Sequence, residues 1–247
     1  MVDTEITFDK RVLFPPLWAG SETSAVARGA EFAFLEHHLI VIDGVDWDAD
    51  MDVIRSGLVK KRREFKGPFR EKEPIKAVRK ELRRLEAHAE RLFKTLYPNF
   101  RSVQTRPSWR PMITGPEPLH FDTYGGDSPL ITSFINVSTV PRKYCVGPNF
   151  PALVAEQPSL MRKLVKASIE KPLDLSYVIR QRTADGLLPL GPDTPRHHID
   201  MAPGAIWFFN AKTVSHEVVY GEGAFGISWE IPACGAAMQA DLLKGLV

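Results

Sequence analysis

Two histidines and one aspartate have the types and spacing to hold a metal ion. His120 and Asp122 stand two residues apart in Leu-His-Phe-Asp, and His216 stands in Val-Ser-His-Glu-Val. Side chains two residues apart on a β-strand point to the same face of the sheet, so the first imidazole and the carboxylate would converge. Two imidazoles and one carboxylate with other coordination positions open are associated with Fe(II) oxygenases. These residues therefore predict an Fe(II) site, and the same three are the predicted catalytic residues.

The segment before His216 favours this prediction. A Pro203-Gly204 turn leads into the apolar segment 205–209. Residues 210–215 then turn the chain back toward the core, so that His216 begins another strand. In a jelly roll that strand can lie beside the strand of His120. His-x-Asp alone is common by chance, and the alternative remains that both histidines are hydrogen-bonded core or rim residues and Asp122 caps a turn.

The remaining histidines are weaker candidates for this site. His197 and His198 are adjacent in the sequence, so on a strand they would point to opposite faces and at most one could join the metal. We expect both at the rim of the site. His88 falls within a charged helical segment, and we expect it to be exposed.

The second part of the chain, residues 101–235, reads as short strands separated by turn formers. Expected strands are 102–109, 119–123, 131–137, 177–182, 205–210, 216–219 and 225–231, with a helix near 158–169. Many short strands separated by turn-forming residues predict a jelly-roll, cupin-like barrel.

The first part, residues 1–100, is mixed and then helical. Residues 39–42 suggest a strand. From Pro74 the apolar residues recur every three or four positions until Pro98, which predicts one amphipathic helix. The whole chain, 1–247, is expected to be a single α+β domain with helices flanking the jelly-roll core.

Composition excludes several classes of protein. The chain has 247 residues, 44% hydrophobic and 25% charged, which is typical of a globular domain. Its two cysteines have no paired spacing, which argues against a disulfide scaffold or a thiolate zinc site. The N-terminus lacks the pattern of a signal peptide, and the apolar runs are too short to span a membrane. A cytoplasmic protein is expected.

Positive charge is concentrated in one segment. Residues 60–94 hold 14 Lys or Arg against 6 Glu, a local charge of +8, so with a total of +2 the rest of the chain sums to −6. This asymmetry mildly favours an acidic or phosphate-bearing small molecule as substrate, although a solvated helix face is the favoured explanation. Few aromatic residues interleave with the basic ones, so no nucleic acid partner is expected.

Several segments resemble the Fe(II)/2-oxoglutarate-dependent oxygenases, and most closely the Kdo dioxygenases. The similar segments are 108–110, 119–122, 134–137, 141–142, 146–150 and 203–232. The resemblance implies a double-stranded β-helix, Fe(II) as cofactor, 2-oxoglutarate and O2 as cosubstrates, and oxidation of a small molecule by hydroxylation, desaturation or ring closure. Asp122 is retained where related halogenases have a small residue, which implies that the chain is no halogenase.

One position departs from the family pattern. Many members have an Arg about ten residues after the distal His, and a Ser two residues later, to hold the far carboxylate of 2-oxoglutarate. Here Gly226 stands at the Arg position, and Ser228 is present.

Another basic residue must then bind this carboxylate, if 2-oxoglutarate is used. Arg110 is our first candidate, because its strand could lie beside the metal, and Arg106 and Arg142 follow. The remaining predicted contacts divide between the cosubstrate, with Thr132, Asn136 and Ser228, and the substrate pocket, with Tyr124, Trp207 and Arg106.

Two other functions remain open from the sequence. The chain could be a non-catalytic jelly-roll binding domain that uses its basic segment. It could also be an Fe-dependent, cupin-like enzyme that does not use 2-oxoglutarate, which Gly226 keeps under consideration.

Overall fold

The structure of the chain is a computed structural model that describes residues 4–6, 17–27, 39–60, 73–97, 104–110, 117–122, 130–150, 187–189 and 194–230. For β4 (Gln104–Arg110) and for Asp122 it describes the backbone. The expected strand at 177–182, the expected helix at 158–169 and Tyr124 lie outside the described residues.

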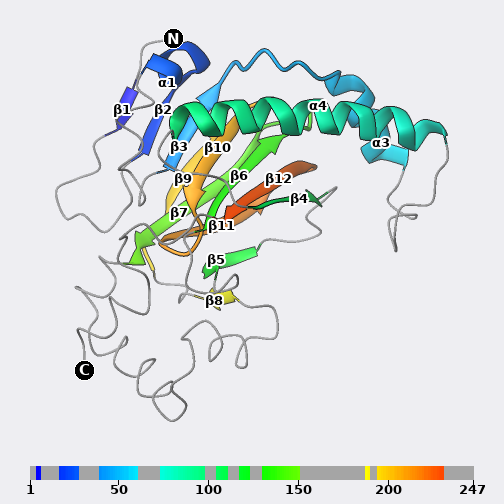
Figure 1. Cartoon of the computed structure of the whole chain (residues 1–247). Coiled ribbons are helices and arrows are strands. Elements are labelled where there is room, and N and C mark those ends of the chain that lie inside the picture. The colour runs from blue at the N-terminus through cyan, green and yellow to red at the C-terminus, as the bar shows by residue number, and fades with distance from the viewer. Residues whose placement is uncertain are drawn as a thin grey trace.

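Two β-sheets form the centre of the molecule (Figure 1). The larger sheet has seven strands in the order β1-β2-β3-β10-β6-β12-β4. These strands are β1 Thr4–Ile6, β2 Leu17–Ser21, β3 Leu39–Asp43, β10 Ile206–Asn210, β6 Leu130–Asn136, β12 Ala224–Glu230 and β4. The smaller sheet has five strands in the order β8-β5-β11-β7-β9. They are β8 Leu187–Pro189, β5 Glu117–Asp122, β11 Val214–Tyr220, β7 Arg142–Asn149 and β9 His197–Met201.

The chain passes back and forth between the two sheets. The strands β4, β6, β10 and β12 belong to the larger sheet, and β5, β7, β9 and β11 belong to the smaller one. Every pairing among these eight strands is antiparallel. This winding is the double-stranded β-helix, so the predicted α+β fold with a jelly-roll core is confirmed.

Two apolar clusters define the two faces of the larger sheet. Residues that alternate along its strands belong to different clusters, as the period of two in a β-strand requires. Phe134, Trp207, Phe209 and Ala224 pack with Tyr144 and other residues of the smaller sheet, and we call their side of each sheet the inner face. Ile135, Phe208, Trp229 and their neighbours lie on the outer face of the larger sheet.

Helix α4 (Glu73–Leu96) covers that outer face (Figure 1). The ring of Phe93 stacks on Trp229 with centroids 4.5 Å apart and planes 5° from parallel. Figure 1 shows β5 and β8 on the far side of the molecule from this helix. The shorter helices are α1 (Glu22–Ala27) and α3 (Met51–Lys60). Among the described helices, none is both long and apolar enough to cross a membrane.

His88 is buried, which contradicts the expectation that it is exposed. Its side chain is only 7% exposed, on the side of α4 that faces the domain. The backbone N–H of Asp48 donates to its Nδ1 at 3.3 Å, and Glu22 lies 3.3 Å from its Nε2. His88 therefore ties α1 and the segment before α3 to the long helix, a role that helical periodicity alone does not reveal.

Candidate metal centre

His120 and His216 lie side by side on neighbouring strands of the smaller sheet. They are direct partners in the antiparallel register of β5 and β11. Their side chains are 2% and 4% exposed, and their ring centroids are 4.3 Å apart with planes at 54°. Metal–nitrogen bonds are about 2.1 Å long, so rings this close can each place a nitrogen on one ion.

The backbone holds His216 in one orientation. Its Nδ1 lies 3.1 Å from the carbonyl oxygen of Val214, which can only accept, so Nδ1 carries the hydrogen and donates it. In the neutral ring the lone pair is then on Nε2, the form in which histidine binds metals. Phe209 packs edge-on against the ring at 4.8 Å between centroids, and Tyr144 lies parallel to it at 6.2 Å.

The turn that delivers His216 is fixed by hydrogen bonds at both ends. Thr213 N–H donates to the carbonyl of Asn210 at 3.0 Å, and Phe150 N–H donates to the carbonyl of Thr213 at 2.7 Å. The Ser215 hydroxyl donates to the carbonyl of Pro148 at 2.7 Å. The end of β7 therefore sets the position at which β11 begins.

Gly147 allows this close approach of β7. A Cβ at this position would lie 2.6 Å from the Ser215 hydroxyl oxygen and 2.7 Å from Cδ2 of Leu119. These two residues immediately precede His216 and His120 in the sequence. A side chain at position 147 would therefore push against both strands that carry the imidazoles.

Asp122 ends the strand that carries His120. Its Cα pairs with that of Leu187 in β8, and it stands two positions after the histidine. Among the described side chains no group of three metal-binding residues is found, and the Asp122 side chain is not one of those described. Its carboxylate as third ligand remains a prediction.

The predicted cosubstrate residues divide between the two ends of the barrel. Register places Ser228 opposite Thr132 and Arg106, in a row that continues to Phe209 beside His216. Arg110 instead lies opposite Ala224, which lies opposite Asn136. β4 lies at the edge of the larger sheet, paired with β12, and the role of Arg110 in binding the cosubstrate stays a prediction.

Asn136 has a structural role. Its side-chain amide donates to the carbonyls of Val140, Met201 and Ala202 at 2.9, 3.0 and 3.2 Å. Its oxygen accepts from the N–H and hydroxyl of Ser138 at 3.1 and 2.8 Å. These partners are all protein groups at the barrel end away from the histidines, so we leave Asn136 out of the proposed cosubstrate site.

Arg142 begins β7 at the same end of the barrel. It is 2% exposed, and its guanidinium lies against Gly221, where an added Cβ would overlap Nη1. Arg142 pairs with Met201 of β9. It stands four residues before Val146 on β7, and Val146 is the residue that pairs with His216. This placement gives the prediction that Arg142 binds the cosubstrate no support.

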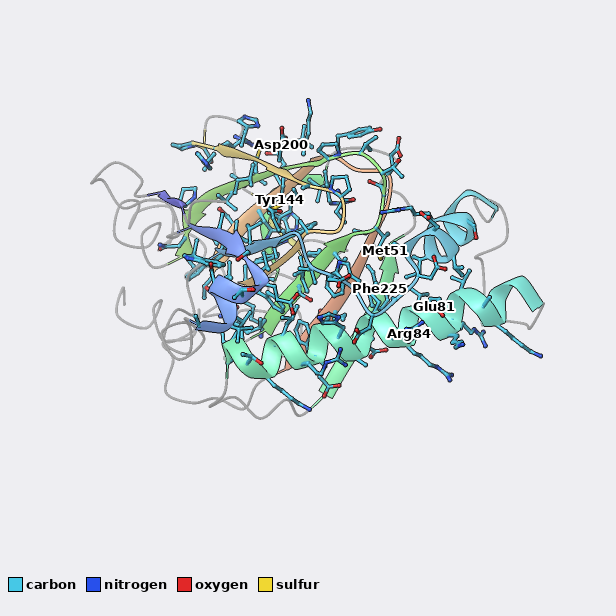
Figure 2. All side chains as sticks on the ribbon, turned by 90° about the horizontal axis from the view of Figure 1, so that it is seen from above. Met51, Glu81, Arg84, Tyr144, Asp200 and Phe225 are labelled. Atoms are coloured by element: carbon cyan, nitrogen blue, oxygen red, sulfur yellow. The ribbon has the colours of Figure 1, made fainter. Side chains whose placement is uncertain are left out.

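Trp207 fills the space between the sheets. It is completely buried on the inner face and contacts Phe134 and Tyr144, with centroids 5.8 and 5.6 Å away. Figure 2 shows Tyr144 among the packed side chains of this layer. Trp207 therefore has a core role, and its place in the substrate pocket stays a prediction.

His197 and His198 occupy opposite faces of β9. His197 pairs with Val146, which pairs with His216, so it belongs to the inner-face row of the metal histidines. Burial lowers the pKa of His197, and His198 lowers it further. His198 lies on the outer face, where its Nδ1 is 3.1 Å from the Cys145 sulfur. The sequence indicated that at most one of the two could reach the site, and register identifies His197 as the one.

Lys212 is a residue that the sequence analysis missed. It lies in the turn between β10 and β11, four residues before His216, and is 2% exposed. A buried lysine requires a partner, but a lysine in a polar turn carries no sequence signal that distinguishes it from an exposed one.

Comparison with known proteins shows similarity at the level of fold. No family model and no curated protein matches the sequence. A Kdo hydroxylase, described as a non-haem Fe(II) α-ketoglutarate-dependent dioxygenase and solved with succinate and Fe(III), has a TM-score of 0.61 at 13% identity. That match covers 98% of this chain and 92% of the hydroxylase. The same enzyme solved with α-ketoglutarate and Fe(III) has a TM-score of 0.61 at 14% identity, with the same coverage. The chain therefore shares the fold of this hydroxylase over nearly its whole length.

Proposed function

We propose that the chain is a non-haem Fe(II)/2-oxoglutarate-dependent oxygenase that oxidises an unactivated C–H bond of a small molecule. The observation that carries the proposal is the buried pair His120 and His216, in register across β5 and β11. It occurs in the fold of a hydroxylase solved with iron and α-ketoglutarate. Asp122, two residues after the first imidazole, is the proposed third ligand.

The donor set fits ferrous iron. Two neutral imidazoles and one carboxylate hold the ion without saturating it, so a chelating 2-oxoacid and O2 can also bind. The hydrogen bond from His216 Nδ1 to the Val214 carbonyl leaves the other ring nitrogen as the donor atom, which is the arrangement a bound metal requires. When bound, the iron with 2-oxoglutarate and O2 supplies the oxidising power, and 2-oxoglutarate becomes succinate and CO2.

The residues around His216 hold its ring in one orientation and exclude water from that side of the candidate site. Phe209 and Tyr144 pack against the His216 ring and are fully buried or nearly so, so this side of the site is dry. A dry pocket strengthens electrostatic interactions and protects a reactive species from side reactions. The chain thus positions the reactants, while the metal and cosubstrate perform the oxidation.

The substrate is proposed only as a small molecule. The exposed basic residues of α4, such as Lys80 and Arg83, lie on the helix that covers the outer face of the larger sheet. Arg84 of this helix is also exposed and forms an ion pair with Glu81 at 2.9 Å. The candidate metal centre lies in the other sheet, so the basic segment gives an acidic substrate no structural support.

An anaerobic titration tests the proposal. Fe(II) and then 2-oxoglutarate are added to the apoprotein, and the weak visible charge-transfer band of the chelate is followed. We expect the band in the wild type and its loss in His216→Ala. Iron that binds without any band would remove 2-oxoglutarate from the proposal.

An iron enzyme that does not use 2-oxoglutarate is the second candidate, because Gly226 stands at the Arg position of the family pattern. Succinate measured against substrate turnover separates the two. Equal amounts support the 2-oxoglutarate enzyme, and turnover without succinate supports the alternative.

A further inference from the structure

A polar row crosses the inner face of the larger sheet next to the metal histidines. Cα pairing runs from Phe209 in β10 to Thr132 in β6, then to Ser228 in β12 and Arg106 in β4. The row begins at the metal centre, because the Phe209 ring packs against that of His216 at 4.8 Å.

Thr132 has an unused hydroxyl in this row. The side chain is 3% exposed, and its Oγ1 has no hydrogen-bond partner. Thr132 stands two residues before Phe134, which packs between the sheets, so both belong to the inner face. A buried hydroxyl without a partner is destabilising unless a ligand supplies one. The site therefore offers a hydrogen bond to a molecule that enters between the sheets.

Ser228 provides a second hydroxyl beside the first. It is half-buried and directly opposite Thr132 in the register of β12 and β6. Its neighbours along β12, Ile227 and Trp229, belong to the cluster under α4, so Ser228 shares the inner face with Ala224. Two hydroxyls on one face suit the two oxygens of a carboxylate.

Arg106 occupies the register position next to Ser228 on the edge strand β4. Cross-strand partners in an antiparallel sheet occupy the same register row, so Arg106 is placed in the row of Ser228 and Thr132 by its backbone position. Arg110 is four residues further along β4, about 13 Å at the rise of a β-strand, and its row contains Ala224 and Asn136. Of these two arginines, only Arg106 stands in the row that contains the two hydroxyls.

We propose that Arg106, with the hydroxyls of Thr132 and Ser228, binds the far carboxylate of 2-oxoglutarate. The cation that the family pattern places on β12, at the position of Gly226, is then supplied from β4. A guanidinium matches a carboxylate in a two-point contact, and burial requires such pairing. The inference rests on the proposed function, since it assigns a residue to the cosubstrate of that reaction.

The test compares two 2-oxoacids on four variants. 2-Oxoglutarate has the far carboxylate, whereas 2-oxobutanoate has the same chelating group without it. The variants are Arg106→Gln, the isosteric Thr132→Val, and the controls Arg110→Gln and Lys212→Gln. Dissociation constants come from anaerobic absorbance titration of the Fe(II)-loaded proteins, with iron affinity and thermal unfolding measured separately. The Arg110 control removes the same charge from the same strand.

We expect Arg106→Gln to weaken 2-oxoglutarate binding roughly 30-fold or more, because a desolvated carboxylate loses its partner. Thr132→Val should weaken it roughly tenfold, since a hydrogen bond to a charged group is lost. Binding of 2-oxobutanoate should change less than about twofold in both variants, and Arg110→Gln should bind both acids as the wild type does.

Two results would overturn the assignment. One is an Arg106→Gln protein that binds 2-oxoglutarate within threefold of the wild type, and a loss in Lys212→Gln or Arg110→Gln would then identify the cation instead. The other is equal weakening of both oxoacids by Arg106→Gln and Thr132→Val, which would indicate general damage to the site. A wild-type protein that binds Fe(II) but neither oxoacid would instead contradict the proposed function.

Discussion

The chemistry of single residues in this chain is set largely by which face of a strand they occupy. Cys145 and Val146 are adjacent in β7, yet Val146 packs between the sheets and Cys145 faces outward toward His198. The inner-face residues surround His216, while the outer-face ones form a separate polar group with Glu217 and Arg196. A change of one position along a strand therefore moves a side chain into or out of the candidate site.

Cys145 should be chemically inert in the folded protein. It is completely buried, and burial, followed by the charge of Glu217, raises its thiol pKa to about 11. The thiolate is the reactive form, so at pH 8 the group stays protonated. In a Cys234→Ser background, iodoacetamide should label Cys145 only after denaturation. Rapid labelling of the native protein at pH 8 would contradict the burial and pKa described here.

Asn136→Ala should destabilise the protein without affecting the cosubstrate. The change removes a buried amide that donates hydrogen bonds to the carbonyls of Val140, Met201 and Ala202. Leaving a buried polar group unsatisfied costs about 1–3 kcal/mol, which chemical denaturation would detect as a lower unfolding free energy. The folded variant should bind 2-oxoglutarate with unchanged affinity, and a selective loss of that affinity would restore Asn136 as a cosubstrate ligand.

At the scale of elements, β7 supports the candidate metal centre. It pairs with β11, and its glycine at position 147 lets it approach both Ser215 and Leu119. The histidines are on β5 and β11, so their separation depends on a strand that carries neither of them.

Gly147→Ala should lower metal affinity. The added methyl would meet the Ser215 hydroxyl at 2.6 Å and force β7 away from β11. Overpacking typically costs about 1–3 kcal/mol, and here the displaced strands hold the imidazoles. Fe(II) binding should weaken at least tenfold by competition with a chelator.

Gly57→Ala is the matched control for this variant. There a Cβ would meet Cγ2 of Val78 at 2.6 Å, between α3 and α4. This overpacking lies outside both sheets, so iron affinity should remain that of the wild type. Equal weakening in both variants would indicate a global effect and would contradict the role of β7.

Sequence reasoning located seven of the twelve described strands, and two of the five that it missed, β7 and β9, have an identifiable cause. The strands carrying His120, Thr132, His216 and Ser228 were predicted within two residues of their observed bounds. Strand β7 was missed because Gly147, Pro148 and Asn149 are turn formers, although all three lie within or at the end of the strand. Strand β9 was missed because its histidines and Asp200 break the apolar alternation that identifies a strand.

The residue types of the candidate site could be predicted from the sequence, but the register of the strands that carry them could not. His-x-Asp and a distal His can be read from the sequence, because alternation and a re-entrant turn are local features. The choice between Arg106 and Arg110 depends on how β4 pairs with β12, a contact across more than a hundred residues of chain. Such pairings are fixed by tertiary packing, which no local pattern encodes.

The whole molecule separates its basic surface from its candidate site. Helix α4 carries exposed basic residues over the outer face of the larger sheet, whereas His120 and His216 belong to the smaller sheet. At physiological ionic strength the Debye length is about 8 Å, so the effect of exposed charges on α4 is screened beyond that range.

Lys80→Gln with Arg83→Gln should therefore leave the site unchanged. Both side chains are exposed on α4. We expect 2-oxoglutarate affinity within about twofold of the wild type at physiological salt, because there the change is screened. The same titration on Arg106→Gln provides the positive control. A large, salt-sensitive loss in the double variant would show that the helix surface guides the anion to the site.

The central claim is that His120, Asp122 and His216 share one ferrous ion, and a crystal structure tests it most directly. Crystals grown anaerobically with Fe(II) and 2-oxoglutarate should show one ion bonded to a nitrogen of each histidine and to an Asp122 oxygen, at about 2.0–2.2 Å. The oxoacid should chelate the same ion and extend toward Thr132. An ion bound elsewhere, or a His216 ring beyond bonding distance of an ion held by the other two residues, would contradict the account.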